Sequence, residues 1–132
     1  MQNTIIVGAG DVGQSIARKL LRHPEYGLNL VGFVDGRPKP RQDGLEEVDL
    51  LGDTEALPRL VRLLDIERVI IAFSEESAEE TLRLLRSLNE LGVQVDIVPR
   101  LYELVGPSAK VDTLEGVPYC RYHRGVAYRS GR

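Results

Sequence analysis

Short apolar runs alternate along this chain with segments whose apolar positions follow helical spacing. The runs have the length of strands, are rich in Val and Ile, and are nearly continuous in apolarity. Continuous apolarity is typical of strands that are buried on both faces, as in a parallel sheet covered by helices. The pattern therefore predicts an α/β fold with strands at residues 4–7, 28–34, 68–73 and 93–98, and a weaker edge strand at residues 50–51.

Two helices are expected in the first half of the chain. The first begins near Asp11, places Val12, Ile16 and Leu20 on one face, and is stopped by the His23-Pro24 pair. The second follows a capping residue, Asp53 or Thr54, and continues to about residue 64 with a proline in its first turn.

A third helix has the clearest boundaries. Residues 77–80 read Ser-Ala-Glu-Glu, a capping box, and Gly92 is a typical C-terminal stop. The leucines between them, at three-residue spacing, predict an apolar face made of Leu82, Leu85, Leu88 and Leu91.

The regular pattern fades after residue 99. A helical turn at residues 101–105 and a last strand at residues 117–122 are the remaining expectations, followed by the cations Arg121, Arg124, Arg129 and Arg132, which meet no acidic residue. We therefore expect one doubly wound, mainly parallel domain over residues 1–120, and a basic tail or linker over residues 121–132.

A glycine-rich loop joins the first strand to the first helix. It reads Gly8-Ala9-Gly10-Asp11-Val12-Gly13. In nucleotide-binding folds of the Rossmann type, the first glycine permits a tight turn, the second leaves room for pyrophosphate, and the third lets helix and strand pack closely. We expect Gly8, Gly10, Asp11, Val12 and Gly13 to form the phosphate end of a nucleotide site, with Asp11 also capping the helix. The alternative is a tight connection that binds nothing.

An acidic residue, Asp35, closes the second strand about 20 residues after the loop, where such folds bind the ribose. Its carboxylate would accept hydrogen bonds from ribose hydroxyls, and its negative charge would repel a 2′-phosphate. Both effects favour NAD over NADP. The cations that follow, Arg37 with Lys39 and Arg41, could instead reach a ribose phosphate of NADP or coenzyme A, or could simply be solvated. Ser74 follows the predicted strand at residues 68–73, at the carboxyl end of the sheet, and is a further candidate for contact with the ligand.

Catalytic and metal-binding residues are not expected. No Tyr is followed four positions later by Lys, the pair that short-chain dehydrogenases use, and His23, His123 and Cys120 have no ligand spacing around them. With 17 basic and 20 acidic residues and a net charge of −3, the chain does not resemble a generic nucleic-acid binder. Its start has neither a signal peptide nor a membrane helix, so a cytoplasmic location is expected.

Several motifs, taken in order, resemble one family. The chain is similar to the nucleotide-binding, CoA-binding-like domain of bacterial polyprenyl glycosylphosphotransferases, which membrane-bound nucleoside-diphosphate-sugar epimerases and dehydratases share. The motifs that carry the resemblance are the glycine loop with its strand, His23-Pro24-Glu25-Tyr26-Gly27, Val31-Gly32-Phe33-Val34-Asp35, Leu51-Gly52-Asp53 and Gly116-Val117-Pro118.

The resemblance implies a role within a larger, membrane-associated enzyme at the cytoplasmic face of the plasma membrane. Such enzymes move a sugar phosphate from a nucleotide sugar to undecaprenyl phosphate, and start exopolysaccharide or capsule synthesis. The resemblance implies a non-catalytic, regulatory nucleotide-binding domain whose partners are the membrane and sugar-transferase domains of that parent. It is also compatible with a homo-oligomer. NAD(H) is the first ligand expected, with coenzyme A, NADP or a nucleotide sugar as alternatives.

The sequence is compatible with two other functions. One is a domain of an NAD-dependent sugar dehydratase or epimerase, or a small dehydrogenase, since the glycine loop suits these equally. The other is a structural or oligomerisation module whose cleft is empty.

Overall fold

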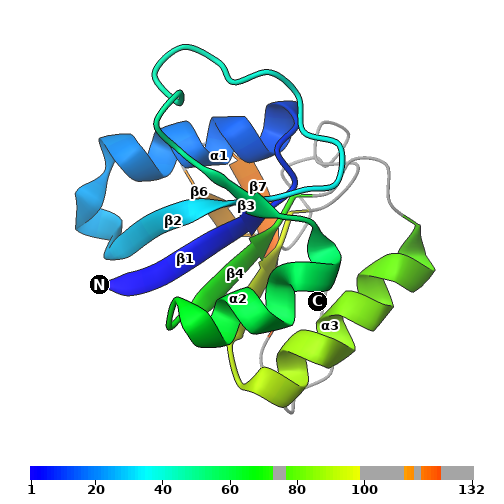
Figure 1. Ribbon diagram of the computed structural model, residues 1–132. Helices are drawn as coiled ribbons and strands as arrows, with labels where there is room; N and C mark the ends of the chain where they lie inside the picture. Colours follow the sequence, from blue (N-terminus) through cyan, green and yellow to red (C-terminus); the bar gives the residue numbers. More distant parts are fainter. Residues whose placement is uncertain (73–76, 99–111, 115–116, 123–132) are drawn as a thin grey trace.

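A seven-stranded sheet forms the centre of the computed structural model, which describes residues 1–72, 77–98, 112–114 and 117–122 (Figure 1). The strand order is β3-β2-β1-β4-β5-β7-β6. The strands are β1 (Gln2–Val7), β2 (Leu28–Val34), β3 (Leu50–Gly52), β4 (Arg68–Ile71), β5 (Gln94–Ile97), β6 (Asp112–Leu114) and β7 (Val117–Tyr122).

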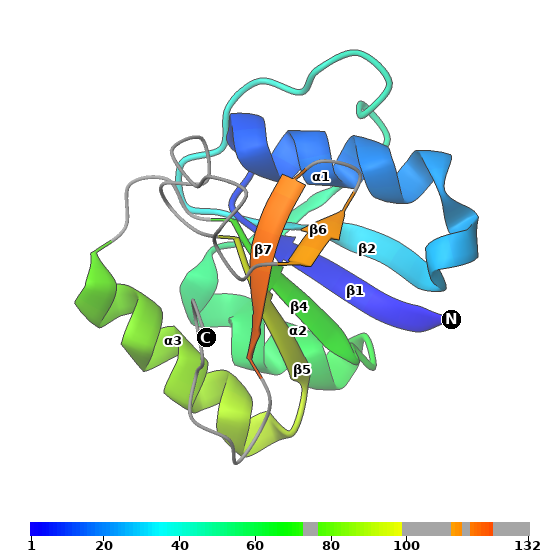
Figure 2. The same cartoon turned by 180° about the vertical axis from the view of Figure 1, so that it is seen from behind.

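The first five strands are all parallel, in the order 3-2-1-4-5 that is typical of doubly wound folds. Two antiparallel strands extend the sheet, because β7 pairs with β5 and β6 pairs with β7, as Figure 2 shows from behind. The predicted mainly parallel α/β sheet is confirmed. The sequence did not indicate β6, and β7 continues two residues beyond the domain end expected at residue 120.

Helices cover both faces of the sheet (Figures 1 and 2). Helix α1 (Asp11–Arg22) lies on one face, and α2 (Leu57–Leu63) and α3 (Ala78–Leu91) lie on the other. Neighbouring residues of β1 therefore enter different cores. Ile6 packs with the α1 side and Ile5 packs with the α2 and α3 side, and both are fully buried. This two-sided burial explains why the strands read as continuous apolar runs.

The ends of the helices follow local signals. The Asp53 carboxylate accepts hydrogen bonds from the N–H groups of Glu55 and Ala56, at 3.1 and 3.2 Å, but the turn it caps is a 3₁₀ segment, η2 (Thr54–Ala56), and α2 begins after it. The hydroxyl of Ser77 accepts a hydrogen bond from the Glu80 N–H at 3.2 Å, as expected of a capping residue, and Gly92 ends α3 with φ of 76°.

The apolar face of α3 differs from the predicted one. Leu84, Leu85 and Leu88 are buried, whereas Leu82 is 51% exposed. The reason is the helical period, since each step of three residues falls about 60° short of a full turn. Leu82 has therefore rotated away from the side that Leu88 occupies, and Leu84 takes its place against the sheet.

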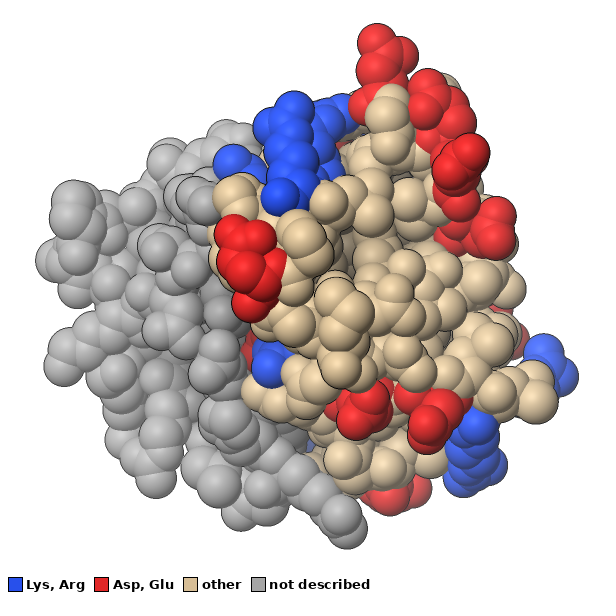
Figure 3. All heavy atoms as spheres, turned by 90° about the vertical axis from the view of Figure 1, so that its left-hand side faces the viewer, with Lys and Arg blue, Asp and Glu red and all other residues tan. Residues whose placement is uncertain are grey.

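Charges are mixed at the end of the molecule where the chain begins. Figure 3 looks onto this side and shows separate groups of basic and acidic side chains. Lys19 and Arg22 lie in the last turn of α1, where cations interact favourably with the helix dipole. A second short 3₁₀ segment, η1 (Pro24–Tyr26), follows α1 and leads into β2.

Candidate functional site

The glycine loop has the geometry that its spacing predicts. Gly8 has φ of 110°, a conformation that other residues rarely adopt, and its N–H donates to the Val34 carbonyl at 2.8 Å. A Cβ atom at Gly13 would lie 1.7 Å from the Gly8 carbonyl oxygen, so only glycine lets α1 approach the end of β1 this closely. The first and third glycines thus have the roles that the motif assigns to them.

Asp11 does not cap α1. The N-cap is Gly10, in extended conformation and without a side-chain cap, and Asp11 is the first helical residue. The capping role predicted for Asp11 is wrong by one position. A cap at Asp11 would require the helix to begin at Val12, but it begins at Asp11 itself. Its carboxylate instead forms an ion pair with the Lys39 ammonium, with 3.1 Å between Oδ2 and Nζ.

Asp35 lies against the glycine loop. Its Oδ2 accepts a hydrogen bond from the Ala9 N–H at 2.7 Å, and its Oδ1 accepts one from the Arg37 N–H at 2.9 Å. The carboxylate thus both opens the turn after β2 and joins this turn to the loop. Each carboxylate oxygen has a second acceptor position, so the group can still accept hydrogen bonds from a ligand.

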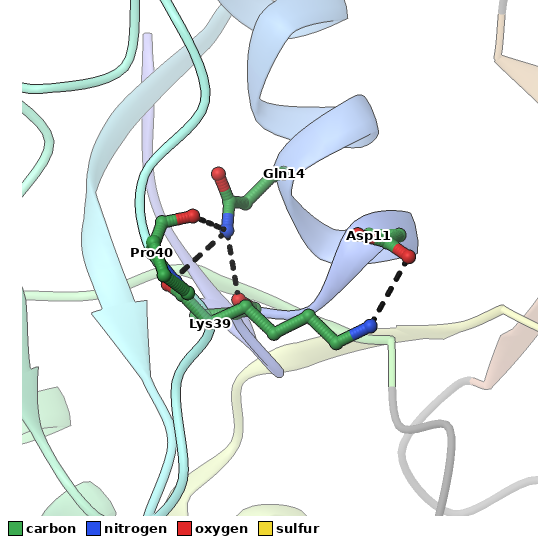
Figure 4. Close-up of polar contacts among 5 residues, drawn as sticks. Asp11, Gln14, Lys39 and Pro40 are labelled. Carbon is green, nitrogen blue, oxygen red and sulfur yellow. Dashed lines mark hydrogen bonds and ion pairs between the residues drawn. The ribbon is translucent and has the colours of Figure 1, made fainter.

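The segment between β2 and β3, residues 36–49, crosses beside the glycine loop and is fastened there by Gln14 (Figure 4). The Gln14 side chain is fully buried. Its Nε2 donates to the carbonyls of Ala9 and Pro40, at 3.0 and 3.1 Å, and its Oε1 accepts from the Gln42 N–H at 2.7 Å. Gln14 is a site residue that the sequence analysis missed. Its only signal is a polar residue inside the buried stripe of α1.

Two further contacts hold the same segment. Leu45 is 1% exposed and packs in the core on the α1 side. The Arg41 guanidinium lies 4.9 Å from the centre of the Phe33 ring, and its Nε donates to the Val48 carbonyl at 3.1 Å. Arg41, considered above as a phosphate contact, is therefore engaged in packing the segment. Of the three cations that follow Asp35, Arg37 and Lys39 line the cleft described next.

A cleft of about 810 Å³ opens at the carboxyl end of the parallel strands. Open α/β sheets bind their ligands at this end, and the volume suits a small-molecule site. One wall is the glycine loop with the start of the 36–49 segment, and the other is formed by η2, α2 and α3. The lining residues are Gly8, Gly10, Asp35, Gly36, Arg37, Lys39, Asp53, Thr54, Glu55, Pro58, Ala72, Glu80, Arg83, Leu84 and Ser87.

Apart from Asp11, which pairs with Lys39, the expected site residues separate into three groups. Gly8, Gly10, Asp35 and Arg37 line the cleft. Gly13 supports the loop from behind, and Val12 packs against the core on the α1 side. Ser74 lies outside the described residues.

The described residues offer neither a cluster of metal ligands nor a membrane-spanning helix. They contain no group of three or more His, Cys, Asp or Glu side chains placed to hold a metal ion. None of their helices has the length and apolarity that a membrane crossing needs.

Curated proteins of polysaccharide synthesis are similar to this chain. The capsular polysaccharide biosynthesis protein CapD of Staphylococcus aureus is 28% identical over 115 residues, which cover 86% of this chain and 19% of that protein. The UDP-glucose:undecaprenyl-phosphate glucose-1-phosphate transferase of Xanthomonas campestris pv. campestris is 24% identical over 129 residues, covering 95% of this chain and 26% of the transferase. The chain thus spans only a minor part of these relatives.

Solved structures share the fold. The UDP-D-quinovosamine 4-dehydrogenase of Vibrio fischeri superimposes with a TM-score of 0.68 at 23% identity, covering 92% of this chain and 93% of that one. The Rex-family repressor RSP in complex with β-NADH superimposes with a TM-score of 0.57 at 25% identity, covering 72% of this chain and 44% of RSP.

A family model agrees with the resemblance found in the sequence. The model, described as a CoA-binding domain, matches residues 1–99, which include the glycine loop, Asp35 and every described wall of the cleft. The chain therefore belongs to the CoA-binding domain family.

Proposed function

We propose that this domain binds an adenine dinucleotide, NAD(H) before others, in the cleft at the carboxyl end of the sheet. The observation that carries the proposal is the Asp35 carboxylate, held 2.7 Å from the Ala9 N–H of the glycine loop. Its second lone pairs are available to ribose hydroxyls beside a loop suited to pyrophosphate. The RSP repressor, of similar fold, is named as a complex with β-NADH.

The phosphate end of the ligand would lie at the start of α1. Gly8 and Gly10 line the cleft without side chains, so backbone can approach a diphosphate closely. The first N–H groups of a helix have no partner inside the helix, and they favour an anion. A diphosphate over the loop and a ribose at Asp35 are compatible with one ligand.

The domain's role in its parent is proposed to be regulatory and not catalytic. The parent is proposed to act in capsule or exopolysaccharide synthesis, at the cytoplasmic face of the membrane. The name of CapD supports capsule synthesis, and that of the Xanthomonas transferase supports undecaprenyl phosphate as the acceptor. The sequence lacks the Tyr-x-x-x-Lys pair that a short-chain dehydrogenase would use. Nucleotide binding would then report metabolic state to a separate transferase domain.

Calorimetric titration of the chain with NAD(H), NADP(H), coenzyme A and UDP-glucose tests the ligand. We expect NAD(H) to bind most tightly. Coenzyme A is the second candidate, favoured by the family description and by Arg37 and Lys39 at the cleft. Absence of binding for all of them at millimolar concentration would leave the structural-module alternative, and hydride turnover by the isolated chain would favour a dehydrogenase.

Substitution of Asp35 locates the ligand. Asp35→Ala should weaken NAD binding roughly tenfold or more, because a hydrogen bond to a charged group contributes about 1.5 to 3 kcal/mol. Asp35→Asn keeps an acceptor for the Ala9 N–H and removes the charge, so it should reduce the preference for NAD over NADP. Asp43→Ala removes an exposed carboxylate from the 36–49 segment and is the matched control. If all three variants bound NAD with the affinity of the wild-type chain, Asp35 would not be part of the site.

A further inference from the structure

Lys39 has a fixed main chain and an accessible side chain. Its N–H donates to the Ala9 carbonyl at 3.2 Å, and its own carbonyl accepts from Gln14 Nε2 at 3.4 Å (Figure 4). The side chain is 59% exposed and lines the cleft together with Gly8 and Gly10. The backbone contacts therefore anchor an ammonium group at the phosphate end of the cleft, although Lys39 is separated from the loop by a long stretch of sequence.

Asp11 holds this ammonium in the structure. The pair bridges the 36–49 segment and the first turn of α1, and the Asp11 side chain is 77% exposed. An exposed ion pair contributes little to stability and can be exchanged at low cost. A ligand diphosphate carries more charge than one carboxylate, and it would repel Asp11 from the same region.

We infer that Lys39 binds the diphosphate of the nucleotide, and that Asp11 is its counter-ion only while the cleft is empty. The inference rests on the proposed function and assigns it two specificity-determining residues. Asp11 acts as an internal competitor that the ligand displaces. The site would therefore select nucleotides that carry a diphosphate, such as NAD, ADP-ribose or coenzyme A, over nucleosides.

The test of Lys39 compares NAD with adenosine. Lys39→Met keeps the aliphatic stem and both main-chain contacts and removes the charge. It should weaken NAD and ADP-ribose binding roughly three- to tenfold, the size expected for a charge-assisted contact at a partly exposed site. Adenosine, titrated by chemical-shift changes, should bind equally to both proteins. Lys19→Met, at the opposite end of α1, is the control and should leave NAD affinity unchanged.

The test of Asp11 uses the same ligands. Asp11→Asn should tighten NAD binding roughly two- to fivefold, because it removes the competing anion and its repulsion. The gain should be smaller in the Lys39→Met background, where there is no ammonium to release. Glu47→Gln, an exposed carboxylate on the 36–49 segment, controls for the change in net charge.

The outcomes separate this inference from the proposed function. Normal NAD binding with unchanged affinity in Lys39→Met would overturn the inference and leave the proposed function standing. An equal gain from Asp11→Asn with and without Lys39 would show that Asp11 acts by repulsion alone, and would overturn the counter-ion exchange. Absence of nucleotide binding in the wild-type chain would overturn both.

Discussion

The two ends of the parallel sheet each carry an ion pair, and the two pairs differ in exposure. At the carboxyl end, Lys39 and Asp11 are 59% and 77% exposed. At the amino end, the Arg68 guanidinium on β4 contacts the Asp96 carboxylate on β5, and these side chains are 13% and 3% exposed. Both join elements that are distant in sequence, yet only the first can be reached by a ligand.

The buried pair belongs to a network that crosses three strands. Arg68 Nε donates to Gln2 Oε1 at 2.8 Å, and Gln2 Nε2 donates to Gln94 Oε1 at 3.4 Å. Buried charges are costly when they lose a partner, whereas exposed charges exchange partners freely. Polar groups at the amino end therefore fix the register of β1, β4 and β5, whereas those at the carboxyl end are available for binding.

Removal of Arg68 should give the largest effect on stability. Arg68→Met takes the guanidinium away from a carboxylate that is almost fully buried, and we expect a loss of about 3 to 5 kcal/mol in the free energy of unfolding. Urea denaturation measures it. Asp11→Asn, which breaks the exposed pair, should change stability by less than about 1 kcal/mol. Similar losses in the two variants would contradict the contrast between the two ends.

A Cβ atom at Gly13 tests how tightly the carboxyl end is built. Gly13→Ala would place the new atom 1.7 Å from the Gly8 carbonyl oxygen, which neither backbone can accommodate without moving. We expect a loss of roughly 3 kcal/mol, at the upper end for overpacking. Gly44→Ala, a site with open space but φ of 87°, is the control for the loss of a glycine. A fully stable Gly13→Ala protein would contradict the close approach of α1 to β1.

Gln14 should affect both stability and ligand binding. Gln14→Leu leaves the Gln42 N–H and the Pro40 carbonyl without their side-chain partner, at a cost of about 1 to 2 kcal/mol. Because the 36–49 segment positions Lys39, NAD affinity should also fall in protein that is still folded. Unchanged amide-exchange protection in residues 39–42 would show that Gln14 does not fasten the segment.

The smallest effect is expected at the amino end, outside the buried network. The hydrogen bond between His23 Nδ1 and Glu25 Oε2, at 2.8 Å, lowers the pKa of the Glu25 carboxyl, and the backbone N–H of Glu25 adds to it. A carboxyl whose pKa is lowered in the folded state stabilises the fold at pH values above its pKa in the unfolded chain. This stabilisation is lost as the pH falls through the pKa of the folded state. In a carboxyl-carbon NMR titration, His23→Phe should raise the pKa of Glu25. No rise would mean that the contact does not persist in solution.

The fold could be predicted well where residue identity reports burial. The Val and Ile runs identified four of the five parallel strands, because two-sided burial leaves a continuous apolar signal. The edge strand β3 is only partly buried, and its signal was the weaker Leu50-Leu51 pair. Polar strand positions carried no such signal. Gln2 and Asn3 belong to β1, but their side chains join contacts at the amino end, so the strand starts earlier than the apolar run.

The candidate site was predictable only where it depends on backbone geometry. Gly8 and Gly13 can be read from sequence, because only glycine permits their conformation or spacing. Gln14 could not be read, because its partners are main-chain groups that almost any residue supplies: the carbonyls of Ala9 and Pro40 and the Gln42 N–H. The contact between Lys39 and Asp11 depends on how the chain folds between two residues that are 28 positions apart.

The outermost strands of the sheet, β3 and β6, are both very short. Each is three residues long, at opposite edges of the sheet. An exposed edge strand presents a row of unpaired N–H and C=O groups, with which a strand of another chain can pair. Very short edge strands are one way in which proteins avoid such pairing. A sheet that tapers in this way offers little template for aggregation, so the five parallel strands can be concentrated for ligand titration with their edges already protected.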